Sequence, residues 1–234
     1  MNMQRVNYSV AAADASASER SAFIRRTYTH LAGAIAAFAL LEAALLNAPF
    51  TPKLVETMTA SRYGWIAVLV MFMGVGYVAD KWARSAVSPE MQYLGLGLYV
   101  VAEAIIFLPI LYIATFMIEG PVIKQAGLLT LTLFAGLTGT VFITRKDFSF
   151  MRSALMMGGF LAMGLVVASL LFGFNLGTIF SVAMVGLSGG YILYYTSNVL
   201  HHYRTDQHVA ASLALFAAVA LMFYYILRLF MSRD

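Results

Sequence analysis

The sequence predicts an all-α integral membrane protein with seven transmembrane helices. Hydrophobic residues make up 61% of the 234 positions and charged residues 11%, whereas soluble domains carry about 25% charged residues. Seven apolar stretches can be drawn, and most approach the ~20 residues that a helix rising ~1.5 Å per residue needs to cross the bilayer core. The connections between the stretches are short. We therefore expect one compact bundle with no inserted soluble domain.

The N-terminal segment is polar and rich in small residues, with the run AAADASASERSA. It lacks the apolar core of a signal peptide. We predict a flexible cytoplasmic tail over residues 1–22 and a seven-helix domain over residues 23–234. An alternative is a short interfacial helix that starts near Ser18 and continues through Phe23 into the first span.

The seven stretches follow one another in a simple order. They cover Tyr28–Asn47, Tyr63–Ala79, Met91–Ile118, Val122–Ile143, Ala154–Phe174, Gly177–Val199 and Val209–Phe230. Pro89 and Pro121 mark boundaries, and Asn175 with Gly177 predicts a tight turn. Pro109 lies inside the third stretch, where a missing backbone donor predicts a kink.

Basic residues are unevenly divided between the two predicted ends of the bundle. If the N-terminus is cytoplasmic, the connections on that side carry ten and the opposite side carries five. The ten are Arg5, Arg20, Arg25, Arg26, Lys81, Arg84, Arg145, Lys146, Arg152 and Arg204, and the five are Lys53, Arg62, Lys124, Arg228 and Arg233. This distribution follows the positive-inside rule, and seven spans then place the C-terminus outside.

Several classes of function lack their sequence signatures. The chain has no cysteine, which excludes thiolate chemistry and Cys-based metal sites. Adjacent His201 and His202 point about 100° apart on a helix, which is poor geometry for shared chelation, so we predict no metal site and no cofactor. No phosphate loop or catalytic motif is present, and the basic residues mark topology rather than a nucleic-acid surface. We expect no enzyme and no nucleic-acid partner; the bilayer itself is the expected surrounding.

Two carboxylates lie within predicted spans, where an ionisable residue costs ~2.5 to 3.5 kcal/mol and normally faces the bundle interior or a wet cavity. Glu42 is five residues from Asn47, so its side chain is favoured to reach the interface. Glu103 is deeper, about twelve residues into its span and six before Pro109. It is the stronger candidate for an ion path, and a buried structural hydrogen bond is the alternative.

A polar stripe runs along the sixth stretch. Tyr191, Tyr195, Asn198 and His202 recur at helical spacing, and hydrocarbon offers such a stripe no hydrogen-bond partner. We therefore expect it to face protein or water. An aromatic belt with a polar cap at a helix end is the alternative, which explains Asn198 and His202 better than the two tyrosines.

Three segments together resemble the bacterial branch of the Bax-inhibitor family, also called the transmembrane Bax inhibitor motif family. TRKDFSFMRSALMMG (144–158) is similar to its K-K-D-x-S-F segment, and YILYYTSNVLHHYRTDQ (191–207) to its Y-I-L-Y-D signature and basic loop. SLALFAAVALMFYYILRLF (212–230) resembles S-L-Y-L-D-x-x-N-L-F followed by L-L-R-x-F. RRTYTHLAG and AEAIIFLPIL fit more loosely. The segments occur in the family's order and span almost the whole chain.

The resemblance implies a bundle of six helices around a central seventh, in a bacterial inner membrane, with calcium or other cations leaking through it. It also implies a proton-sensing gate made by two aspartates, one in the sixth helix and one in the seventh. Here Tyr195 and Phe216 occupy these two positions, so both carboxylates are missing. The basic residue that accompanies the pair is replaced by YVADKWARS, in which Lys81 or Arg84 would need a shifted register.

Two functions follow from this pattern. One is a cation leak channel whose pore is closed by packing or controlled from Glu103, in place of the aspartate pair. The other is a non-conducting accessory or regulatory subunit of a larger membrane complex, in which Phe216 belongs to a dry, packed seventh helix and aromatic side chains contact other membrane proteins.

Overall fold

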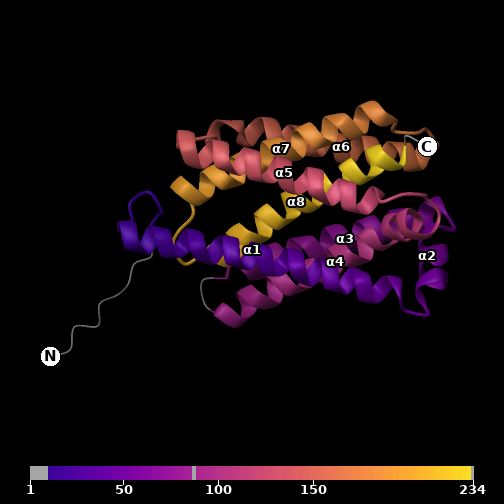
Figure 1. The fold of residues 1–234 in the computed structure, drawn as a ribbon, viewed down its shortest axis with the longest axis horizontal. Helices are drawn as coiled ribbons and strands as arrows, with labels where there is room; N and C mark the ends of the chain where they lie inside the picture. Colours follow the sequence, from indigo (N-terminus) through magenta and orange to yellow (C-terminus); the bar gives the residue numbers. More distant parts are fainter. Residues whose placement is uncertain (1–9, 86–87, 233–234) are drawn as a thin grey trace.

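The computed structural model describes residues 10–85 and 88–232 as a bundle of helices (Figure 1). Within these residues, seven helices are long and apolar enough to cross a membrane. They are α1 (Ala17–Leu46), α3 (Arg62–Ala83), α4 (Pro89–Phe116), α5 (Val122–Thr144), α6 (Arg152–Phe172), α7 (Thr178–His201) and α8 (His208–Met231). The predicted fold class, an all-α protein with seven transmembrane helices, is confirmed.

The helix boundaries follow local capping chemistry. Ser16 opens α1 with a capping box, in which its hydroxyl accepts from Glu19 N–H while the Glu19 carboxylate accepts from Ser16 N–H. The Ser61 and Ser88 hydroxyls cap α3 and α4 more simply, each accepting one hydrogen bond, from Gly64 N–H and Met91 N–H. α6 ends at Gly173, whose φ of 75° is the left-handed conformation that glycine adopts without strain. The helix α4 continues through Pro109.

The sequence did not predict α2 (Thr51–Thr59), a short helix between the first two spans. Pro52 lies in its first turn, where a missing N–H costs nothing. The Thr51 hydroxyl donates to the Leu45 carbonyl at the end of α1, and Val55 and Met58 are buried. Together with the loop after α4, α2 lies at the end of the bundle opposite the start of α1 (Figure 1). We call this end the α2 end.

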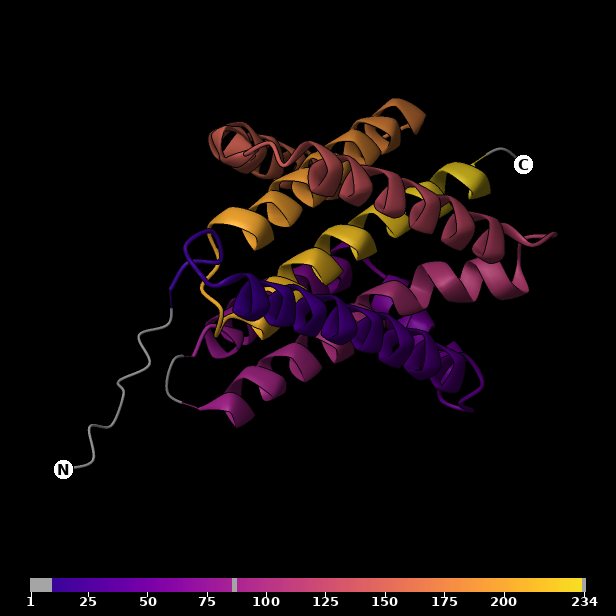
Figure 2. The ribbon, with the colours of Figure 1, turned by 60° about the vertical axis from the view of Figure 1, so that its left-hand side comes forward.

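Residues 10–22 of the predicted tail have defined structure, so the tail boundary at residue 22 needs correction. Ala12 N–H donates to the Tyr203 carbonyl over 2.8 Å, and Thr205 N–H donates to the Val10 carbonyl over 3.1 Å. The helix α1 then starts at Ala17, because the Ser16 capping box fixes its first turn there. Residues 1–9 lie outside the described residues. The segment thus pairs with the α7–α8 connection, far away in sequence (Figure 2).

The helix α8 is the most deeply buried of the seven spans. In its most apolar window 78% of the residues are buried, against 6% in α3 and 11% in α6. It packs against α1, α3, α4, α5 and α7, while α6 packs on α7 and α3. This arrangement makes α8 the inner helix and α3 and α6 peripheral. The stricter prediction of six helices surrounding a seventh is not established by these contacts.

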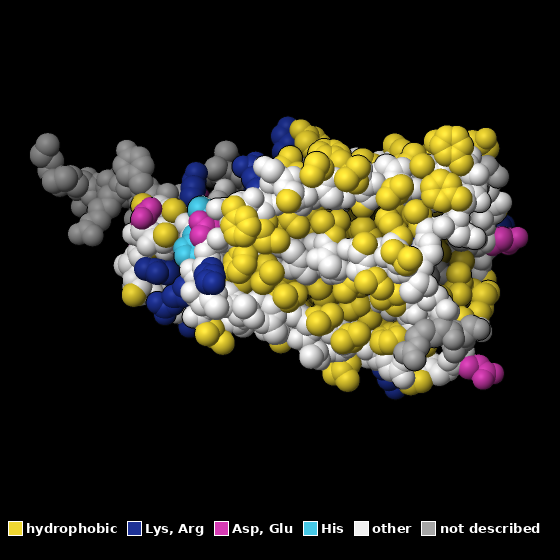
Figure 3. All heavy atoms as spheres, turned by 90° about the horizontal axis from the view of Figure 1, so that it is seen from above, with side chains coloured by type: hydrophobic (Ala, Val, Ile, Leu, Met, Phe, Trp, Pro, Cys, Tyr) yellow, Lys and Arg dark blue, Asp and Glu magenta, His cyan; other side chains and the backbone are white. Residues whose placement is uncertain are grey.

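The surface fits this arrangement. Hydrophobic side chains form a broad band around the middle of the bundle, and charged side chains gather toward its two ends (Figure 3). Large apolar residues that are exposed include Leu128, Phe160 and Ile179. Because these side chains would be costly in water, the band is the surface that contacts lipid. Arg84, Arg152 and Arg204 lie at the end where α7 connects to α8, which we call the basic end.

Candidate functional site

The polar stripe of α7 faces a cavity at the basic end. Tyr191, Tyr195, Asn198 and His202 all line this hollow of about 390 Å³, which we call the vestibule. Its other walls come from the end of α3, the start of α6 and the α7–α8 connection, including Arg84, Arg152, Tyr194, Tyr203 and Gln207. The stripe is therefore turned toward protein and a polar hollow, not toward the lipid-facing band.

A second and larger cavity lies deeper in the bundle. It measures about 720 Å³, and α3, α4, α6, α7 and α8 all contribute walls; we call it the intramembrane cavity. Glu103 lines it, with 6% of the residue exposed. The Tyr99 hydroxyl, one turn earlier on α4, lies near the Glu103 carboxyl. Glu103 therefore borders a cavity and has a polar neighbour in Tyr99.

Tyr191 and Tyr195 line both cavities. Their rings are stacked, with centroids 5.9 Å apart and an interplanar angle of 13°. The Tyr191 hydroxyl also donates to the Leu155 carbonyl of α6 over 2.8 Å, which ties the pair to a peripheral helix. Gly159 lets this side chain approach, because a Cβ there would lie 2.6 Å from the Tyr191 oxygen. The stacked pair therefore forms the partition between the vestibule and the intramembrane cavity.

Glu42 does not reach the interface, so the snorkelling prediction is wrong. The residue is 4% exposed, and neither carboxyl oxygen has a hydrogen-bond partner among the described residues. Leu31, Ala34 and Phe38 precede it at helical spacing on the face of α1 that packs into the core. That face turns Glu42 inward against α4 and α8, and Glu42 lines neither cavity.

Phe216 occupies a closed aromatic site. It is 2% exposed, and its ring meets those of Phe38 and Tyr99 edge to face, with centroids 6.0 and 6.2 Å away. Tyr195 packs against the same buried cluster. The two positions that would carry aspartates in the family's gate are thus filled by aromatic packing, which holds the α7–α8 contact without a proton-sharing pair.

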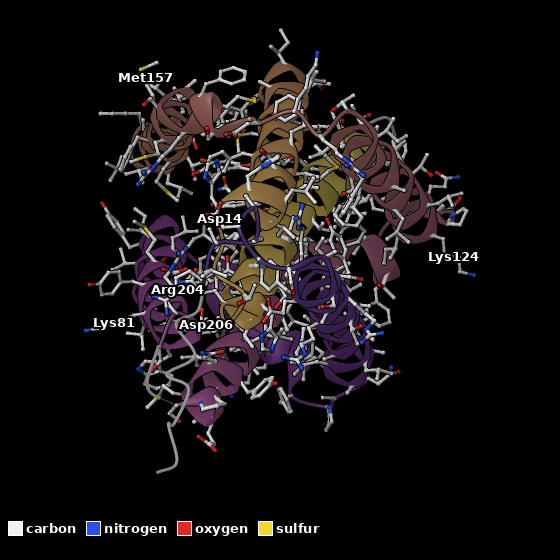
Figure 4. The ribbon with its side chains drawn as sticks, turned by 90° about the vertical axis from the view of Figure 1, so that its left-hand side faces the viewer. Asp14, Lys81, Lys124, Met157, Arg204 and Asp206 are labelled. Atoms are coloured by element: carbon white, nitrogen blue, oxygen red, sulfur yellow. The ribbon has the colours of Figure 1, made fainter. Side chains whose placement is uncertain are left out.

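Lys81 and Arg84 are the two residues that could replace the basic residue of the family's aspartate gate, and Arg84 is the one that lies at the vestibule. Lys81 points away from the bundle in Figure 4, whereas Arg84 lines the vestibule. The Arg84 guanidinium donates to Asp80 over 2.8 Å. Its hydrogen bond to that carboxylate raises the pKa of Arg84, so the side chain stays charged. Asp80 is thereby paired with Arg84 at the end of α3.

The α5–α6 connection is fastened to α7 through Asp147, a contact that sequence reasoning did not assign. Asp147 accepts from Ser149 N–H over 2.8 Å and lies 2.9 Å from the His202 ring, while Ser197 accepts from Phe148 N–H. Burial raises the pKa of the Asp147 carboxyl, but the hydrogen bonds from Ser149 and His202 outweigh this and lower it to about 2. The D-x-S spacing of the TRKDFSF segment was the available signal, since it is typical of an Asp side chain capping a turn.

Sequence reasoning also missed Tyr99 and Arg152. Tyr99 lies four residues before Glu103, a spacing that places both on one helix face. Arg152 begins α6 and faces the vestibule. In the vestibule wall, burial also raises the pKa of Tyr203 to about 12, so its hydroxyl is neutral. Tyr203 and Arg152 thus belong to the vestibule wall, and Tyr99 belongs to the wall of the intramembrane cavity.

Fold and site together define a multi-pass membrane protein with seven helices, a polar vestibule and an intramembrane cavity. The family model described as "Inhibitor of apoptosis-promoting Bax1" matches residues 20–234. The chain therefore belongs to this Bax-inhibitor family, as the three sequence segments indicated.

Relatives from three kingdoms agree with this membership. An uncharacterized protein of Pseudomonas aeruginosa is 27% identical over 97% of this chain and 97% of its own length. Bax inhibitor 1 of Schizosaccharomyces pombe is 27% identical over 93% of this chain and 79% of its length. A BI1-like protein of Arabidopsis thaliana is 32% identical over 50% of this chain and 48% of its length. No solved structure matches the chain.

Proposed function

We propose that the protein is a non-enzymatic cation leak pathway, with calcium as the first ion to test, whose gate is aromatic instead of a carboxylate pair. One observation carries the proposal: Tyr191 and Tyr195 line both the vestibule and the intramembrane cavity that holds Glu103. Two hollows that share a thin wall need only a side-chain movement to become continuous. Cation leak is also the activity that the family resemblance implies.

Charge along this route is compatible with cation passage at its inner part. Glu103 is the acidic residue among the described residues that line the intramembrane cavity. At the vestibule, Asp80 offsets the charge of Arg84, which leaves Arg152 as a basic side chain at the mouth. We expect Arg152→Gln to increase cation flux, because a positive charge in a narrow hollow repels cations.

The test is calcium efflux from liposomes that contain the purified chain and an indicator outside. Wild type should release calcium faster than empty vesicles at neutral pH. Tyr195→Ala should increase the rate by removing half of the partition, and Tyr194→Ala is the matched control because Tyr194 lines the vestibule alone. Glu103→Gln should reduce the rate, whereas Glu42→Gln should leave it unchanged. Flux equal to that of empty vesicles in wild type and in Tyr195→Ala would refute the proposal.

A non-conducting accessory subunit is the second candidate, favoured by the packing of Phe216. A core that is closed by Phe38, Tyr99 and Phe216 leaves no polar route along that side of α8. Extraction in a mild detergent followed by native separation distinguishes the two functions. Co-migration with a stoichiometric membrane partner would support the accessory role, and migration alone at the mass of one chain would count against it.

We further propose that the basic end faces the cytoplasm of a bacterial cell, with the protein in the inner membrane. The positive-inside rule supports this orientation. Because the chain has no cysteine, single cysteines at Ser18 and Ser232 are clean reporters for the two ends. In intact spheroplasts, an impermeant maleimide should label the cysteine at position 232 and not the one at position 18. The reverse pattern would invert the orientation.

A further inference from the structure

The intramembrane cavity combines an aromatic lining with an isolated acid. Aromatic rings from four helices line it: Trp65 and Phe72 from α3, Tyr99 from α4, Tyr191 from α7, and Tyr224 and Tyr225 from α8. Its volume of about 720 Å³ lies within the ~300 to 1,000 Å³ typical of sites for drug-sized molecules. The cavity is therefore large enough for an organic ligand and offers it aromatic rings among aliphatic side chains.

Glu103 has no cationic partner in this cavity. None of the ion pairs among the described residues includes it, and the polar group beside it is the Tyr99 hydroxyl. Arg228 is the basic residue among the described lining residues, and it donates to the Leu176 carbonyl over 3.1 Å. The ring of Phe107 on α4 stacks on that of Phe223 on α8, which relates the levels of the two helices. Glu103 precedes Phe107 by four residues, and Arg228 follows Phe223 by five. At ~1.5 Å per residue, these offsets separate Glu103 from Arg228 by about 13 Å along the bundle.

An uncompensated carboxylate among aromatic rings selects for one kind of ligand. Ring faces attract positive charge, most strongly where water is excluded, and the carboxylate adds a counter-charge. A small hydrated metal ion finds few oxygen ligands in such a lining, which favours passage over retention. An organic cation with a large apolar body gains from the rings and from the carboxylate together.

We propose that the intramembrane cavity is a binding site for lipophilic organic monocations, with Glu103 as the counter-charge and the aromatic rings as the walls. Quaternary ammonium and phosphonium compounds are the ligand class. Binding of an organic cation does not depend on ion flux, so the binding site and the proposed leak pathway are tested by independent experiments.

Tetraphenylphosphonium is the probe, because tetraphenylborate has nearly the same shape and the opposite charge. The affinity of the purified full-length protein for each of the two ions is measured by equilibrium dialysis in a neutral detergent. In a Trp82→Phe background, Trp65 is the remaining tryptophan and reports directly from the cavity wall. We expect the phosphonium to quench Trp65 and to bind at least about tenfold more tightly than the borate, which corresponds to ~1.4 kcal/mol.

Variants separate charge from shape. Glu103→Gln should remove the preference for the phosphonium over the borate, while Glu42→Gln, another buried glutamate that does not line the cavity, should retain it. If Glu103→Gln does not fold, Val166→Phe on the peripheral helix α6 fills part of the cavity and should weaken binding of the phosphonium. Equal affinity for the two probes, or unchanged binding in both variants, would overturn the inference, whatever the liposome experiment shows.

Discussion

Glu42 and Glu103 are the same residue type on two neighbouring helices, yet their surroundings differ in kind. Both are buried, at 4% and 6% exposure. Glu42 lies in closed packing, and neither of its carboxyl oxygens has a partner among the described residues. Glu103 borders the intramembrane cavity, and the Tyr99 hydroxyl lies near its carboxyl group. A glutamate can therefore be buried in this bundle without lining a cavity. Whether it lines one depends on whether its helix face packs against other helices or borders a hollow.

The largest expected difference between the two sites is chemical access. Dicyclohexylcarbodiimide is an apolar reagent that couples to carboxyl groups and partitions into membrane cavities. We expect it to modify Glu103 and to leave Glu42 essentially unmodified, because the reagent fits a hollow of about 720 Å³ but not closed packing. Peptide mass spectrometry after partial reaction measures the two yields. Glu103→Gln should abolish the main adduct, and similar labelling of both residues would remove the distinction.

The second largest expected difference between Glu42 and Glu103 is the change in the free energy of unfolding when each is replaced by leucine. A buried polar group that lacks a partner costs about 1–3 kcal/mol, so Glu42→Leu should raise the free energy of unfolding by an amount in this range. Glu103→Leu should gain less, since the Glu103 carboxyl lies near the Tyr99 hydroxyl and borders a cavity instead of closed packing. Denaturant unfolding in detergent, followed by tryptophan fluorescence, measures both variants. A loss of stability in Glu42→Leu would point to a partner that this packing does not show.

A third carboxylate, Asp147, sharpens the comparison because it is fully partnered and lies outside the spans. Its folded-state pKa is depressed to about 2, below the ordinary value near 3.8. A depressed acid stabilises the fold above its unfolded pKa and loses this contribution as the pH falls through the folded value. Asp147 is 45% exposed, so solvent screening keeps the effect small.

The smallest predicted change therefore comes from Asp147→Asn. Wild type should melt at a slightly higher temperature than Asp147→Asn at pH values above about 4, and the gap should shrink between about pH 4 and 2. Thermal unfolding of both proteins across this range is the measurement. A gap that widens on acidification would show that Asp147 is not held in its ionised form by Ser149 and His202.

Short segments of the sequence determine the number of spans and several of the helix ends. Seven apolar stretches determine seven spans, because an unpaired backbone is too costly in hydrocarbon for any structure but a helix here. Serines before three of the spans and Gly173 after α6 determine helix ends through hydrogen bonds within a few residues. The family follows from three separated segments, and Tyr195 and Phe216 alone establish that the paired aspartates are absent.

Tertiary structure decided which faces of those helices meet. In a span whose whole circumference is apolar, periodicity does not mark the inward face, so the sequence could not assign Glu42 to closed packing or Glu103 to a cavity. It also could not place Arg84 and Arg152 beside the α7 stripe, or pair residues 10–12 with the α7–α8 connection, because those contacts join elements far apart in the chain. Local hydrogen bonding sets each helix, whereas the packing of several helices around α8 determines where a polar side chain finds open space.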